Sequence, residues 1–129
     1  MNVLAIALGG ACGALLRYGI ALATKQLWVS PVTATIANFP LGTFIANMLG
    51  AFLMGMLYQY FQRTPQNETT RLFLTTGFLG ALTTFSTFAL ESANLLRQGA
   101  SITAVFYLVL TNLLGIMLIF AGIQLVGTE

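Results

Sequence analysis

The residues between Gly77 and Phe88 are the part of this sequence whose side chains are best suited to binding a small ion. These twelve positions hold two glycines, three phenylalanines and four hydroxyl side chains, inside a hydrophobic stretch long enough to cross a bilayer. Polar side chains and non-helical backbone are tolerated at membrane depth where they are buried in protein or line a wet cavity. The segment therefore predicts a helix that unwinds in mid-membrane, over residues 77–84, and lines a site.

Two phenylalanines of this segment could contact an anion through their ring edges. Phe85 and Phe88 are three residues apart, so on a helix they share a face. The edge of an aromatic ring is positive, and it can contact a small anion without binding it as tightly as a full charge would. Ser86 and Thr87, between the rings, add hydroxyl donors. The alternatives are that the rings are ordinary core residues and that Thr87 bonds its own helix backbone.

Three further polar residues lie in or near the hydrophobic stretches. Asn47 carries two amide N–H donors that could replace the water lost by an anion, or that could instead bond a neighbouring helix. Glu91 continues the face of Phe88, and its carboxylate is costly unless it is paired or wet. It could bond threonine hydroxyls, or it could be an interfacial charge at the end of a helix. Arg17 is either a positive pore mouth or a side chain that snorkels to the lipid headgroups.

The composition places the chain among membrane proteins. Hydrophobic residues make up 57% of the sequence and charged residues only 6%, against roughly 25% charged residues in a soluble domain. The net charge of +2 comes from scattered basic residues, which argues against a nucleic-acid partner. The sequence contains no histidine, and it shows no nucleophile–base pair or metal-ligand cluster, so we do not expect an enzyme.

Charges and helix breakers divide the chain into four apolar spans. Pro40 and the turn residues around Pro65 separate the second span from its neighbours. Each span is near or above the ~20 residues needed to cross a bilayer. Gly9 and Gly13 have the spacing that lets membrane helices pack closely. We therefore expect one all-α membrane domain over residues 1–129, with a third helix that is broken and with transmembrane helices at about residues 3–23, 40–61, 71–96 and 102–126.

The distribution of basic residues gives little instruction about orientation in the membrane. With four spans, both termini and the middle loop share one side, which carries Arg63 and Arg71. The opposite side carries Lys25 and Arg97, and Arg17 lies near it. Two basic residues against three are almost no positive-inside bias. The chain is therefore a candidate for insertion in both orientations followed by antiparallel dimerisation, and the alternative is that one orientation dominates.

Three segments, in their order along the chain, resemble the small fluoride channel family (Fluc, also called CrcB). They are GGACGALLRY at residues 9–18, PLGTFIANMLG at residues 40–50, and the run from Gly77 to Phe88 followed by Glu91. The resemblance implies an antiparallel, dual-topology homodimer of four-helix subunits with two fluoride pores and a central structural sodium ion. It also implies a bacterial plasma or inner membrane, where passive export of fluoride reduces its toxicity in the cytoplasm.

The resemblance also implies roles for individual residues. It assigns Gly80 and Thr83 to the sodium site through their backbone carbonyls. Arg17 is the weaker candidate for a pore mouth. Residues 116–120 of the fourth span are all apolar, whereas relatives carry hydroxyls there, so the fourth helix's share of the pore stays open. Some members of the family pair unlike subunits, so the partner is a second copy or an unlike paralogous subunit. The expected pore residues are Asn47, Phe85, Ser86, Thr87, Phe88 and Glu91.

Two other functions are compatible with a short four-span protein. A small multidrug exporter is also a dual-topology four-helix dimer, but it needs an acid inside the membrane. The first span here has no acid, and Glu91 lies near the end of a helix. A structural subunit that transports nothing would not need the track of hydroxyls and phenylalanines. We therefore expect a passive fluoride channel.

Overall fold

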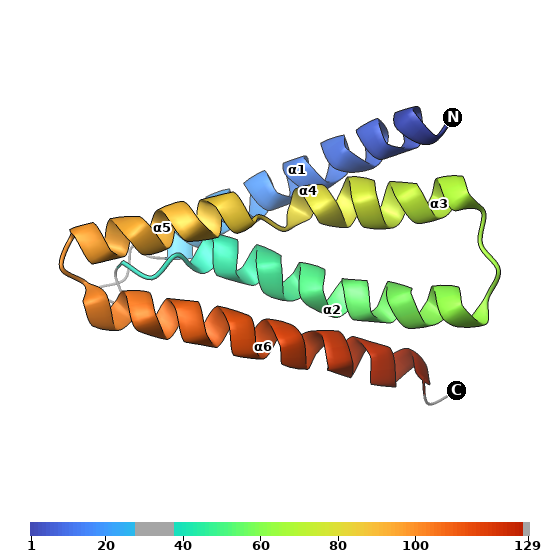
Figure 1. Cartoon of the computed structure of the whole chain (residues 1–129). Coiled ribbons are helices and arrows are strands. Elements are labelled where there is room, and N and C mark those ends of the chain that lie inside the picture. Colours follow the sequence, from blue (N-terminus) through green and yellow to red (C-terminus); the bar gives the residue numbers. More distant parts are fainter. Residues whose placement is uncertain (28–37, 128–129) are drawn as a thin grey trace.

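The computed structural model describes residues 1–27 and 38–127, and this part of the chain is helical apart from short connections (Figure 1). Four helical segments within it are long and apolar enough to cross a membrane, which confirms the all-helical prediction and the number of spans for the described residues. The start of α1, the α2–α3 turn and the end of α6 lie at the same end of the molecule. The segments are α1 (Asn2–Leu27), α2 (Leu41–Arg63), a composite third segment (Glu68–Arg97) and α6 (Ser101–Gly127).

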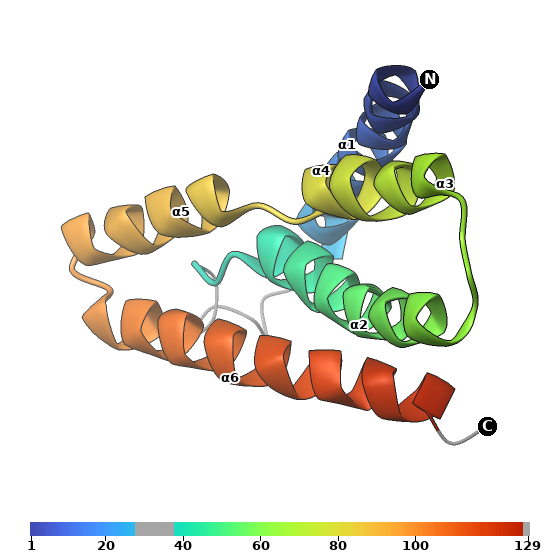
Figure 2. The same ribbon diagram turned by 45° about the vertical axis from the view of Figure 1, so that its right-hand side comes forward.

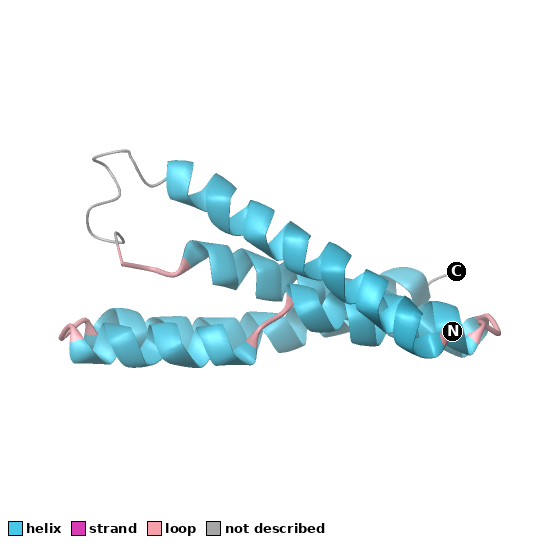
Figure 3. Cartoon of the chain, turned by 90° about the horizontal axis from the view of Figure 1, so that it is seen from above, coloured by secondary structure: helices cyan, strands magenta, loops and turns pink. Residues whose placement is uncertain are grey.

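The third segment is built from four helical pieces. The Asn67 side chain caps α3 (Glu68–Leu72) by accepting the Thr69 amide at 2.9 Å. A π-helix, η2, and the short helix α4 follow, and two extended residues then lead into α5, as the loop within this segment shows in Figure 3. The bounds are η2 Phe73–Leu79, α4 Gly80–Leu82 and α5 Phe85–Arg97.

The predicted unwinding over residues 77–84 is wrong in its extent. Gly77 lies inside the π-helix, and Gly80 has ordinary helical angles of φ −62° and ψ −32°. Only Thr83 and Thr84 leave the helix, with ψ values of 151° and 117°. Gly77 serves close packing instead, because a Cβ atom there would lie 2.7 Å from the Ile6 carbonyl oxygen of α1.

Glycines also bring the long helices together in two pairs. On α1, Gly9 and Gly13 lie against backbone atoms of η2, so that no side chain would fit between the two helices. Gly55 of α2 and Gly122 of α6 make the same kind of contact between those helices, which run side by side in Figure 2. The Arg63 guanidinium adds a polar tie by donating to the carbonyls of Val126, at 2.8 Å, and Gly127.

The helix pairs are joined by two apolar clusters on either side of the Thr83–Thr84 break. One lies between α2 and the helices before the break, and its buried members are Ala46, Leu79 and Leu82. The other joins α5 to α6 beyond the break. A left-handed glycine, Gly99 with φ 75°, makes the turn that brings α6 back against α5. The buried members of this second cluster are Phe39, Phe88, Leu95, Ala104 and Tyr107.

Candidate functional site

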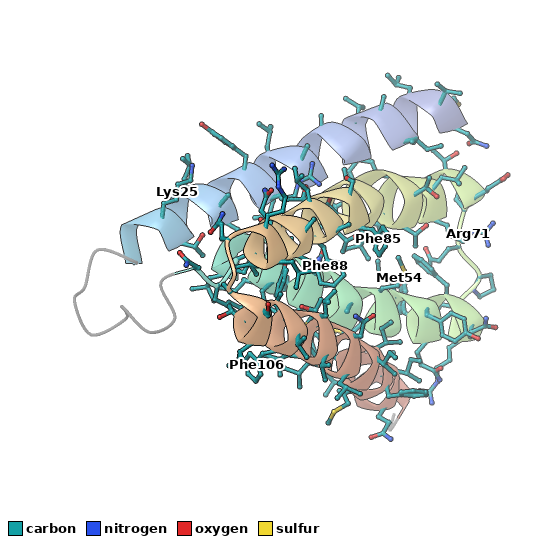
Figure 4. The ribbon with its side chains drawn as sticks, turned by 60° about the vertical axis from the view of Figure 1, so that its left-hand side comes forward. Lys25, Met54, Arg71, Phe85, Phe88 and Phe106 are labelled. Atoms are coloured by element: carbon teal, nitrogen blue, oxygen red, sulfur yellow. The ribbon has the colours of Figure 1, made fainter. Side chains whose placement is uncertain are left out.

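A cavity of about 480 Å³ lies between α2, the helix break, α5 and α6. We call it the central cavity. Figure 4 shows Phe85, Phe88 and Met54 in the middle of the molecule, where these elements meet. No charged side chain lines the cavity within the described part of the chain. Its polar lining consists of amides and hydroxyls, and the residues that matter below are Asn47, Thr83, Thr84, Phe85, Phe88 and Thr111.

The Asn47 side chain holds the break in place. Its Oδ1 atom accepts the Thr84 backbone amide at 2.8 Å, and its Nδ2 atom donates to the Thr84 carbonyl at 3.4 Å. In a continuous helix the Thr84 amide would donate to the Gly80 carbonyl instead. Asn47 therefore bonds a neighbouring helix, which is one of the two roles that the sequence left open. Its second N–H group does not take part in this contact.

The hydroxyls around the break form a short cluster at the start of α5. Thr84 caps the helix, because its Oγ1 atom accepts the Thr87 amide at 3.2 Å. The same Oγ1 atom lies 3.1 Å from the Thr87 hydroxyl and 3.3 Å from the Ser86 hydroxyl. The Thr87 hydroxyl therefore bonds another side chain, and Ser86 is exposed.

Two backbone carbonyls near the break lack the amide donors that they would have in a continuous helix, because the Asn47 and Thr84 side chains bond those amides instead. The Gly80 carbonyl loses the Thr84 amide to Asn47, and the Thr83 carbonyl loses the Thr87 amide to the Thr84 hydroxyl. Gly80 is exposed, and the nearest atom to a Cβ built on it is 3.6 Å away. These carbonyls end a helix, where the backbone dipoles are negative, and they have the chemistry of ligands for a hard cation.

The two phenylalanines lie together but differ in their surroundings. Their ring centroids are 6.0 Å apart with planes inclined at 50°, as expected for residues on one helix face. Phe88 is 6% exposed and meets the Tyr107 ring edge-on at 5.0 Å, whereas Phe85 is 80% exposed. Core packing thus describes Phe88 in this chain, and it does not describe Phe85.

Glu91 is half-buried and bonded by two hydroxyls from two other helices. The Thr43 hydroxyl of α2 donates to Oε1 at 2.7 Å, and the Tyr107 hydroxyl of α6 donates to Oε2 at 2.9 Å. Of the two alternatives left open for this carboxylate, the structure has the bond to a threonine hydroxyl. Glu91 also lines two cavities, of about 350 and 280 Å³, at the end of the molecule away from the termini. Sequence reasoning did not identify which threonine binds Glu91 and missed Tyr107, because no local spacing connects either residue to Glu91.

The fourth long helix contributes hydroxyls before its apolar run begins. Thr111 lines the central cavity, and its Oγ1 atom is buried with no hydrogen-bond partner among the described residues. Within the run at residues 116–120, Ile116, Met117 and Phe120 are exposed, so they face away from the bundle. Arg17 lies half-buried on α1 and does not line the central cavity. The structure thus brings Asn47, Gly80, Thr83 and residues 85–88 together around the break, places Glu91 further along α5 beside Thr43 and Tyr107, and leaves Arg17 apart.

Four helical segments of the described residues are long and apolar enough to cross a membrane, which indicates a multi-pass membrane protein, and three of them enclose the uncharged central cavity. The sequence profile of one family, described as "CrcB-like protein, Camphor Resistance (CrcB)", matches residues 4–123, and the chain belongs to this family.

Several relatives align over nearly the whole chain. A protein of Desulfotalea psychrophila is 42% identical over 122 residues, which are 95% of this chain and 89% of the relative. A protein of Shewanella pealeana is 42% identical over 97% of this chain and 95% of its own length. One from Staphylococcus aureus is 43% identical, with 98% of each chain covered. Their names are "Fluoride-specific ion channel FluC", with the suffix 1 for the last of them.

Proposed function

We propose that this chain is a passive, fluoride-selective ion channel that exports fluoride from the cytoplasm and so reduces its toxicity. The observation that carries the proposal is the central cavity, which is lined by hydroxyls, amides and aromatic rings and by no charged side chain in the described part of the chain. Membership of the CrcB family and relatives named as fluoride-specific channels support the same conclusion.

An uncharged, donor-rich cavity suits rapid passage of a small, strongly hydrated anion. Fluoride loses water on the way in, and neutral donors replace that water without holding the ion as tightly as an arginine or lysine would. The Thr111 hydroxyl, which has no partner among the described residues, the second N–H of Asn47 and the exposed ring of Phe85 are such groups. Chloride is larger and gains less from close donors, so a narrow path of this kind favours fluoride.

Two features support an antiparallel, dual-topology dimer, either of two copies or with an unlike paralogous subunit. The weak charge bias permits both orientations in the membrane. Phe85 and Gly80, on either side of the break, are exposed in a single subunit. A partner that covers this face would complete two pores, each with residues on both sides of the ion. Such a dimer also puts the break of each subunit, at about mid-membrane, next to its partner.

The carbonyls of Gly80 and Thr83 fit a structural sodium ion at the dimer contact, since both have lost their helical donors. The ion would supply positive charge that offsets the carbonyl dipoles and ties the two breaks together. The protein's own part is to keep these carbonyls free, and Asn47 and Thr84 do so by occupying the competing amides.

The host membrane in this proposal is a bacterial plasma or inner membrane. A cell that is negative inside drives anions outward, by about 2.3 kcal/mol per charge for 100 mV. No coupled ion or nucleotide is needed for export under that potential.

The direct test is fluoride efflux from liposomes that contain only this purified chain, followed with a fluoride electrode after a potassium ionophore removes the electrical barrier. We expect fast fluoride efflux and no chloride efflux. Proton-coupled uptake of a quaternary ammonium dye without fluoride efflux would point to a multidrug exporter. No transport at all by a well-folded dimer would point to a structural subunit or to the need for an unlike partner.

Orientation is tested separately. Two lysines added to the loop at residues 62–70 should fix one orientation, because this loop and the termini would then carry a clear positive excess. As the sole subunit, that variant should lose activity, and mixing it with an oppositely biased variant should restore it. Full activity with one proven orientation would rule out the antiparallel dimer.

A further inference from the structure

A second cavity, of about 380 Å³, lies between the end of α2 and the start of the third segment, at the end of the molecule that holds the termini. We call it the Arg71 cavity. Tyr58 and Gln62 line it from α2, and Arg71 and Thr76 line it from the third segment. None of the sequence motifs assigned a role to it.

The Arg71 cavity combines one cationic side chain with neutral polar side chains, and no acidic side chain of the described residues lines it. The Tyr58 hydroxyl, the Gln62 amide, the Arg71 guanidinium and the Thr76 hydroxyl have no hydrogen bond or ion pair with any described residue. No carboxylate lines the cavity, and Glu68, one turn before Arg71, makes no ion pair with it in the described part of the chain. A pocket with a guanidinium, neutral donors and no acid is suited to a hydrated anion.

One residue, Met54, lines both the Arg71 cavity and the central cavity. The face of α2 that carries Asn47 continues with Met54, Tyr58 and Gln62, at spacings of 7, 4 and 4 residues. Polar groups therefore follow this face from one cavity to the other, and Met54 interrupts them. Figure 4 shows Met54 between Arg71 on one side and the phenylalanine pair on the other. Methionine is unbranched and flexible, so it can change rotamer at little cost.

We propose that the Arg71 cavity is an antechamber that collects anions for the central cavity, and that the Met54 side chain is the movable apolar barrier between the two. The proposal rests on the proposed channel function and names the route by which the same anion reaches the pore. Arg71 raises the local anion concentration by its charge, and it does not line the central cavity, so the pore itself stays uncharged. Met54 keeps water and larger solutes from forming a continuous wet path when no anion passes.

The test uses the full chain in proteoliposomes, with fluoride efflux measured at low and high ionic strength. Arg71→Gln should lower the flux about threefold at low salt, which is the Boltzmann factor for one unit charge about 7 Å away in water. The deficit should vanish near 1 M salt, where the Debye length is about 3 Å. Arg97→Gln is the matched control, because it removes the same charge from the opposite end of the molecule, outside this cavity. We expect the control to conduct like the wild type.

Met54→Ala should raise the flux and admit chloride, whereas Met54→Leu, which nearly conserves volume, should change neither. The elution profile of each variant in detergent reports whether the assembly is intact. If the wild type conducts and Arg71→Gln conducts equally well at low salt, the antechamber proposal is overturned, whereas the channel function is not. A deficit that is independent of salt and varies with the content of anionic lipid would instead make Arg71 a headgroup anchor. Wild-type liposomes that do not conduct fluoride would overturn the channel function itself.

Discussion

Replacing Asn47 with aspartate tests whether this side chain acts on a passing anion or only on the helix break. An aspartate oxygen can accept the Thr84 amide just as Asn47 Oδ1 does at 2.8 Å, so the variant keeps the stronger half of the contact. It loses both Nδ2 donors, of which one reaches the Thr84 carbonyl at 3.4 Å. A bond that long contributes little. The architecture of the break should therefore survive the change.

The effect on flux should be large, because the carboxylate would be the one charge lining the central cavity within the described residues. Two like charges about 4 Å apart repel by about 4 kcal/mol at an effective dielectric constant of about 20. Since about 1.4 kcal/mol corresponds to a factor of ten, fluoride flux should fall by about three orders of magnitude.

The assay compares fluoride efflux and detergent elution profiles for three proteins. Asn67→Asp is the control, because it adds the same charge to the turn before α3 and keeps the oxygen that accepts the Thr69 amide. Asn47→Ala is the complement, since it leaves the Thr84 amide unsatisfied and should lower the free energy of unfolding by about 1–3 kcal/mol. An Asn47→Asp protein that elutes normally and conducts at an ordinary rate would refute the reasoning, because the ion could not then pass this residue.

The remaining predictions concern the rings, the open glycine and the carboxylate. Phe85→Ile and Phe88→Ile should both cut fluoride flux, but the second should lower the melting temperature more, because both lose the Phe85–Phe88 ring pair whereas only Phe88 also loses a buried ring contact, with Tyr107, worth about 0.5–1.5 kcal/mol. Ordinary flux in both variants would exclude the ring edges. Gly80→Val should leave a folded subunit, since the glycine has helical angles and open space around it, but it should abolish the dimer. A Gly80→Val protein that still elutes as a normal dimer in sodium-free buffer would contradict the sodium site. Tyr107→Phe should lower stability by about 1–3 kcal/mol in thermal melts, because Glu91 then keeps only the Thr43 donor; an unchanged melting temperature would contradict this.

The spans and the location of the polar site could be predicted because their signals are local. Long apolar runs between turn residues fix a transmembrane helix by composition alone, and α2 begins at Leu41, directly after Pro40. The hydroxyls near Phe85 mark a site for the same reason, since lipid would not tolerate them. The helix ends at Arg63 and Arg97 also follow from local charges, which avoid the bilayer interior.

The contacts that shape the site could not be predicted, because they join residues far apart in the chain. Asn47 and Thr84 are 37 residues apart, and Thr43 and Glu91 are 48 apart, so no periodic pattern relates them. The prediction that the helix unwinds from Gly77 is wrong for a related reason. Gly77 suggested unwinding, but its function is to let a neighbouring helix approach, and a sequence alone does not distinguish a flexible glycine from a small one.

The Asn47–Thr84 contact has a consequence for how the protein is made. A third helix newly inserted in lipid, before α2 reaches it, gains several kcal/mol for each backbone group that it satisfies by itself. It should therefore insert as a continuous helix and open at Thr83 and Thr84 only when the Asn47 amide is there to replace the lost bond. The path for ions is then a property of the finished bundle, so a nascent or misassembled chain would not leak.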